Sequence, residues 1–228
     1  MSRSSSAGIS DAVWDRTGGS HALSERAYVA LITFWTAAGL ASTAAAAKMS
    51  ADWQFSWQLA LGSFAVAIVG IFIALGSDNP VISLFGYGLV VISEGLLLGP
   101  VLALYTQASI AKVFLVTSGM VTVLGAAGII YPKSLASWGG WLFGGLLLLI
   151  LGLLIVPIAA AFGVNVGGAL TVLDWVGIVL FGAYVIYDLN RAMDLERTLD
   201  NTVDVALAVY LDFINIFIRL LRLYGEKK

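Results

Sequence analysis

The chain has 228 residues, of which 60% are hydrophobic and 11% charged, and its formal net charge is −2. A soluble domain carries about 25% charged residues, so this composition excludes an ordinary soluble core and indicates an integral membrane protein. The small net charge argues against a nucleic-acid-binding surface, and no nucleic-acid partner is expected. Cysteine is absent and the one histidine, His21, lies in a polar segment. Thiolate chemistry and histidine-based metal or catalytic sites are therefore excluded from the membrane region.

Residues 1–26 are polar and lack the apolar run of a signal peptide, which predicts a disordered N-terminal tail. Residues 27–228 are predicted to form one transmembrane domain. Each of its seven apolar segments reaches the roughly 20 residues that a helix needs to cross a bilayer. These segments lie near 27–47, 53–75, 80–105, 111–131, 138–160, 170–189 and 203–223. The sequence thus predicts an all-α, multi-pass bundle of seven transmembrane helices, in the plasma (inner) membrane if the protein is prokaryotic.

Glycine and proline add local expectations. The fifth segment contains Gly140 and Gly144, four residues apart and flanked by Gly139 and Gly145. Small residues at this spacing let membrane helices approach closely, and we expect this face to pack within the chain rather than to form an oligomer interface. Prolines inside the third and fifth segments should kink or open those helices.

Positive residues do not fix the orientation by number. With the N-terminus inside, each side of the membrane receives six lysines and arginines. Arg219 lies within the seventh segment, where it does not count fully, and five arginines cluster in the tail and between residues 190 and 202. We therefore expect the N-terminus and this connection to be cytoplasmic.

Acidic residues inside the membrane are the main functional signal. An aspartate at the centre of a membrane helix costs about 2.5–3.5 kcal/mol on insertion scales, so such acids face the protein interior and mark functional sites. Helical spacing places Asp174, Gly177, Phe181, Tyr184 and Asp188 on one face of the sixth segment. The same spacing groups the polar residues of the seventh segment, which are Asp204, Ala208, Asp212, Asn215, Arg219 and Arg222.

Two of these acids are the central candidates. Asp188 and Asp212 can meet only if the sixth helix continues beyond Asp188 or the following connection folds back. Glu94 in the third segment is a third candidate. The simpler interpretation of Asp174 is an N-terminal helix residue favoured by the helix dipole, and Arg219 can extend its head group to the membrane surface.

Several stretches resemble one family. The sequences "YDLNRAMD" (187–194), "VDVALAVYLDFINIFIRLLRLYG" (203–225) and "SEGLLLGPVLALY" (93–105) resemble the transmembrane Bax inhibitor motif family. The resemblance covers the whole predicted membrane part. It implies a seven-helix bundle with the seventh helix at its centre, and a pH-sensitive calcium leak across the membrane.

The resemblance also implies residue roles. The family's paired aspartates on helices six and seven correspond to Asp188 and Asp212, which share a proton in the closed state. Some relatives oppose this pair with a basic residue on helix two, but the second segment here has none. Arg191 or Arg219 are candidates to replace it, with Asn215 and Asp174 as further supporting residues. Calcium is expected as the transported ion, with Asp188 and Asp212 as ligands and Glu94 as a further oxygen, and no cofactor is expected.

We expect a channel and not an enzyme, and other functions compete with this interpretation. Intramembrane aspartyl proteases also pair two aspartates, one of them after a tyrosine, as in Tyr187-Asp188. Their second aspartate lies in a glycine-rich motif, whereas Asp212 follows "VYL". A retinal protein needs a lysine inside the membrane for its Schiff base, and the five lysines here lie at segment ends, in loops or at the C-terminus. A membrane regulator that binds other proteins, in control of cell death or of membrane proteolysis, stays open as an alternative.

Overall fold

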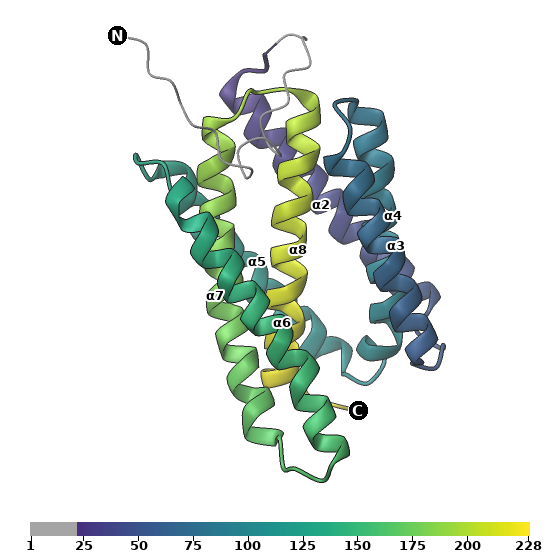
Figure 1. Cartoon of the computed structure of the whole chain (residues 1–228). Helices are drawn as coiled ribbons and strands as arrows, with labels where there is room; N and C mark the ends of the chain where they lie inside the picture. Colours follow the sequence, from purple (N-terminus) through teal and green to yellow (C-terminus); the bar gives the residue numbers. More distant parts are fainter. Residues whose placement is uncertain (1–21) are drawn as a thin grey trace. The chain divides into compact units, whose positions relative to one another are not determined.

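The computed structural model describes residues 22–228, and these form seven α-helices, one short 3₁₀ helix and a single isolated β-bridge (Figure 1). Six helices are long and apolar enough to cross a membrane. The seventh predicted segment forms α8 (Leu199–Tyr224), which carries more charged residues than those six. The prediction of an all-α integral membrane protein is confirmed. Residues 1–21, most of the predicted tail, lie outside the described residues, and the boundary at residue 26 stays a prediction.

The described chain divides into two compact units. The first comprises residues 22–103 and 194–207, and the second comprises residues 104–193 and 208–228. Helix α8 contributes its first part to one unit and its remainder to the other.

The first unit contains α2 (Glu25–Met49), α3 (Trp57–Leu75) and α4 (Pro80–Leu102). Side chains of Ser24, Ser56 and Asn79 accept hydrogen bonds from the first turns of these helices, as N-caps do. Helix α4 packs against both α2 and α3. The α3–α4 contact is close because Gly70 and Gly86 face each other: a Cβ on either would lie 2.5–2.6 Å from the other's carbonyl oxygen.

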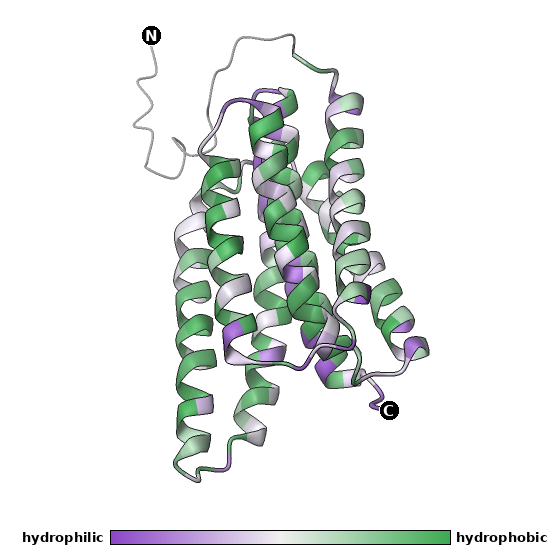
Figure 2. Cartoon of the chain, turned by 90° about the vertical axis from the view of Figure 1, so that its right-hand side faces the viewer, coloured by the Kyte–Doolittle hydropathy of each residue, from purple (hydrophilic) through white to green (hydrophobic). Residues whose placement is uncertain are grey.

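The second unit contains α5 (Gln107–Ile130), the 3₁₀ helix η1 (Ala136–Trp138), α6 (Gly139–Ala161) and α7 (Gly167–Asp194). A short loop joins α6 to α7, and the two helices lie side by side (Figures 1 and 2). The C-terminal residues return to the start of α5, where the amide of Thr106 donates to the carbonyl of Glu226 and the amide of Lys228 donates to that of Leu104.

Two expectations about the second unit are corrected. Gly140 and Gly144 have no atom within 4 Å of an added Cβ, so they do not pack within the chain. The glycines of α6 that approach α7 are Gly139, Gly145 and Gly152, which lie against Tyr187, Leu180 and Leu173. The connection before α8 is also shorter than the predicted 190–202, because α7 continues to Asp194 and α8 begins at Leu199.

The helices differ strongly in burial. Every residue from 200 to 221 in α8 is buried or half-buried. In α6, only Leu142 and Leu149 are buried, and apolar residues cover nearly the whole helix (Figure 2). An apolar exposed helix is what a lipid environment requires, whereas a polar helix must be shielded from lipid. The prediction that the seventh segment is the most enclosed helix agrees with this burial.

Candidate functional site

The two central aspartates meet within the second unit. Asp188 on α7 and Asp212 on α8 are hydrogen-bonded to each other through their carboxyl groups. Asp212 is 4% exposed and Asp188 is half-buried. A hydrogen bond between two carboxyl groups requires one of them to carry the proton. We call Asp188 and Asp212 the aspartate pair.

Their meeting depends on the length of α7. The helix continues for more than a turn beyond Asp188, to Asp194, so Asp188 lies inside the helix and not at its end. This was one of the two conditions that the sequence set for the two acids to meet. Tyr184, one turn before Asp188, lies within electrostatic range of both carboxyl groups. Its place on the polar face of the sixth segment was visible in the sequence, but its proximity to both acids was not predicted.

One oxygen of the pair has no N–H or hydroxyl donor. Oδ2 of Asp212 is buried, and no backbone amide, side-chain N–H or hydroxyl group of the described residues donates to it. A buried polar atom of this kind is costly and commonly marks a place where a proton, water or ion is handled.

The pair is not a closed metal site. Across residues 22–228, no three histidine, cysteine or acidic side chains gather closely enough to hold a metal ion. Ca²⁺ takes six to eight oxygen ligands, so two carboxylates need carbonyl or water oxygens to complete such a shell.

The remaining predicted residues lie in different surroundings. Glu94 is half-buried on α4 and belongs to the first unit, so its role beside the pair stays a prediction. Asn215 donates its side-chain N–H to the carbonyl of Leu211, 2.9 Å away on its own helix. Arg191 lies one turn after Asp188 and is engaged in contacts within the fold.

Asp174 and Arg219 form a second polar contact between α7 and α8. Asp174 is the eighth residue of α7 and lies beyond its first turn, so the interpretation as an N-terminal helix residue is wrong. Its Oδ1 accepts hydrogen bonds from Nη1 of Arg219, at 3.4 Å, and from Nη2 of Arg222. Arg219 is 3% exposed, so it does not extend its head group to the membrane surface.

Asn190 is a structural residue that the sequence reasoning missed. Its Nδ2 donates to the carbonyls of Gly128, Tyr131 and Lys133, and its Oδ1 accepts from the amide of Leu135. These bonds attach the turn after α5 to α7, two residues from Asp188. Asn190 lies inside the quoted stretch "YDLNRAMD", which was the available signal.

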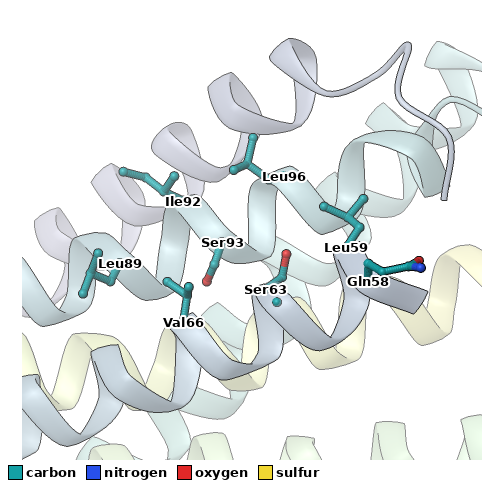
Figure 3. Close-up of a pocket in the computed structure, with 9 residues that line it drawn as sticks. Gln58, Leu59, Ser63, Val66, Leu89, Ile92, Ser93 and Leu96 are labelled. Atoms are coloured by element: carbon teal, nitrogen blue, oxygen red, sulfur yellow. The ribbon is translucent and has the colours of Figure 1, made fainter. Parts of the chain in front are cut away.

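A separate cleft opens in the first unit between α3 and α4, with a volume of about 320 Å³. Figure 3 shows leucine, isoleucine and valine side chains around it, with the hydroxyl groups of Ser63 and Ser93 and the amide of Gln58. No titratable side chain lines it. The cleft therefore has neither the charge nor the acid–base chemistry of an ion or catalytic site.

Comparison with known proteins identifies the family. The family model described as inhibitor of apoptosis-promoting Bax1 matches residues 24–228. The chain belongs to the Bax inhibitor-1 family. The family motifs quoted from the sequence all lie inside the matched region.

Individual relatives are bacterial. The inner membrane protein YbhL of Escherichia coli K12 is 29% identical over 143 residues, which cover 59% of each chain. A protein of Deinococcus radiodurans is 27% identical over 217 residues, which cover 89% of this chain and 91% of that protein. YrjE of Lactococcus lactis is 30% identical over 138 residues, 58% of this chain and 56% of that protein. The match thus spans about three fifths of YbhL. The six apolar helices and the inner-membrane relative support a multi-pass integral membrane protein of the bacterial inner membrane.

Proposed function

We propose that this chain is a pH-sensitive calcium leak channel whose opening is controlled by the aspartate pair. The observation that carries the proposal is the hydrogen bond between Asp188 and Asp212, two acids on different helices, α7 and α8. A shared proton joins α7 to α8 in the second unit. Loss of that proton leaves two like charges in a medium of low dielectric constant, where they repel strongly.

The open state then has the ligands that a hard cation needs. Two ionised carboxylates repel each other and attract a divalent cation, and carboxylate and carbonyl oxygens are the ligands that Ca²⁺ prefers. Asp188 and Asp212 are the proposed calcium ligands, Glu94 is a further oxygen on the path, and Ca²⁺ is the transported substrate. Deprotonation of the pair favours opening, so calcium flux rises as the pH rises through the titration of the pair.

The membrane regulator is the second candidate function. The family description, inhibitor of apoptosis-promoting Bax1, favours it. A regulator needs a surface for a partner and no ion path. The intramembrane protease remains a distant third, because its support is limited to the aspartate pair.

The test uses the full-length chain purified and reconstituted in liposomes that contain a calcium indicator. We expect calcium entry well above that of protein-free liposomes. A peptide-cleavage assay on the same preparation separates the protease. Cleavage without calcium flux would contradict the channel and support the protease, and the absence of both would contradict the channel and leave the regulator.

A further inference from the structure

Arg219 is held in a slot on the polar face of α7. Three residues of α7, each about one turn from the next, surround the side chain of Arg219: the carboxylate of Asp174 bonds to it, and Gly177 and the ring of Phe181 lie against it. We call Asp174, Gly177 and Phe181 the arginine slot. The guanidinium carbon lies 5.5 Å from the centre of the Phe181 ring. A Cβ on Gly177 would lie 2.5 Å from Cδ and Cζ of Arg219, so only glycine leaves room for the side chain.

The charges at this slot do not balance. Asp174 bonds to both Arg219 and Arg222, and the three side chains are 8%, 4% and 41% exposed. One carboxylate opposes two guanidinium groups, which leaves one net positive charge. Nε of Arg219 is buried and bonds to none of the residues that the structure describes. A buried positive charge that is only partly compensated is costly to keep, which suggests a function beyond packing.

The slot and the aspartate pair occupy the same interface. Asp174, Gly177, Phe181 and Asp188 share one face of α7, and Asp212 and Arg219 share one face of α8. Both contacts join these helices within the second unit. Asp174 and Asp188 are fourteen residues apart on α7, about 21 Å at ~1.5 Å per residue. A cation that passes the aspartate pair and continues along this interface must therefore also pass Arg219.

We propose that Arg219 is the charge barrier that limits the passage of cations along the α7–α8 interface and that lowers the flux of divalent cations more than that of monovalent cations. This inference rests on the proposed channel function. Coulomb repulsion is proportional to the charge of the ion, so the barrier that Arg219 presents to Ca²⁺ is about twice the barrier that it presents to K⁺. Asp174 and Gly177 act as positioning residues, because they fix where the guanidinium lies.

The test compares calcium and potassium flux of the reconstituted full-length chain at one pH. Arg219→Met removes the buried charge and keeps an apolar chain of similar length, while Asp174 retains Arg222 as its partner. We expect a several-fold rise in both fluxes, with the fold-increase for Ca²⁺ near the square of that for K⁺. Arg219→Lys keeps the positive charge and should stay near the wild-type flux.

The controls separate charge from packing. Gly177→Ala should displace the guanidinium and raise the flux in the same direction as Arg219→Met. Lys112→Met removes one positive charge from an exposed site on α5 and should leave both fluxes unchanged.

The possible outcomes distinguish the two proposals. If the wild type conducts and Arg219→Met conducts equally, or if Arg219→Lys rises as far as Arg219→Met, the barrier is wrong and the channel stands. If neither the wild type nor Arg219→Met conducts, both proposals fail. If Arg219→Met conducts and the wild type does not, the channel function of the native chain is contradicted, and the barrier, which rests on it, fails with it.

Discussion

At the scale of single residues, the aspartate pair combines burial with mutual contact. Asp212 is 4% exposed, its Oδ2 has no N–H or hydroxyl donor in the described part of the chain, and its carboxyl group is hydrogen-bonded to Asp188. Two acids in such contact titrate as a unit, so their protonation belongs to the pair and not to either residue. This makes a specific prediction for variants of each acid.

Asp212→Asn and Asp188→Asn should each abolish the pH dependence of calcium flux. An amide preserves a hydrogen bond to the remaining carboxyl group but cannot lose the shared proton. The double variant should add little to either single variant, because coupled residues are not additive. The measurement is calcium flux into liposomes at several pH values. Independent effects that sum in the double variant would show that the two acids do not act together.

Single glycines decide how closely helices approach in the first unit. Gly86→Ala should destabilise this unit, because the new Cβ would lie 2.5 Å from the carbonyl oxygen of Gly70 and 2.5 Å from the amide of Ala74. Backbone atoms cannot move aside as a flexible side chain can, and overpacking costs about 1–3 kcal/mol. Thermal unfolding in detergent, followed by circular dichroism, should show a lower midpoint.

Gly88 provides a matched control on the same helix. It lies two residues from Gly86, and an added Cβ there meets no atom within 4 Å. Gly88→Ala should therefore unfold at the wild-type midpoint or above it, since alanine favours helix more than glycine does. Equal destabilisation by the two substitutions would contradict the assigned α3–α4 contact.

At the scale of elements, the sequence predicted seven helices, and their observed bounds lie within five residues of those expected. Long apolar runs are strong signals, because a bilayer demands about 20 residues per helix. The last turns of α7 were harder to predict, because "NRAMD" is polar and reads equally well as a loop. That extension brings Asp188 into contact with Asp212, so the candidate site depended on the least certain boundary.

Spacing within a helix predicted faces but not the neighbours of those faces. Asp174, Gly177, Asp188, Asp212 and Arg219 were correctly grouped on polar faces. The position of Arg219 against Gly177 was not predictable, because it depends on the direction of a long side chain. The neighbours of Gly140 and Gly144 were not predictable either, and the expectation that they pack within the chain was wrong. Periodicity shows which residues share a face, but only the tertiary structure shows what lies opposite that face.

Asn190 should be the main polar attachment between α7 and the turn after α5. Asn190→Ala removes the bond to Leu135 and the contacts of the two amide N–H groups with three carbonyls, and each buried group left unsatisfied costs about 1–3 kcal/mol. We expect a marked fall in the thermal unfolding midpoint. Asn190→Asp keeps the acceptor for Leu135 but loses both N–H donors, so it should also destabilise the chain.

Asn165 offers a control of the same residue type. It is exposed, and its side chain accepts one hydrogen bond from the amide of Gly167. Asn165→Ala should change the unfolding midpoint far less than Asn190→Ala does. A wild-type midpoint for Asn190→Ala would mean that the contacts of Asn190 do not hold the turn in place.

At the scale of the whole molecule, the orientation in the membrane remains a prediction that labelling can test. The native chain contains no cysteine, so single cysteines can be placed freely. Ser5→Cys and Glu196→Cys should react from the cytoplasmic side, and Asn165→Cys from the opposite side, if each of the six helices from α2 to α7 crosses the membrane. Glu196 is exposed in the short connection before α8, whereas Thr202 is fully buried and unsuitable for labelling.

The labelling experiment fixes the orientation of the chain, and the orientation decides which side of the membrane supplies protons to the aspartate pair. Labelling of Ser5→Cys and Glu196→Cys from opposite sides would refute the proposed topology. Labelling of both from the outer side would keep the number of crossings and reverse the orientation.

In the proposed channel, the protonation of Asp188 and Asp212 controls calcium flux. The decisive measurement is the pH profile of calcium flux through the full-length chain in liposomes, beside that of the double variant Asp188→Asn/Asp212→Asn. We expect wild-type flux to rise as the pH rises through the titration of the pair, and we expect the double variant to give a flat profile. A double variant that retains the wild-type profile would show that the two acids do not control the flux and have only a structural role.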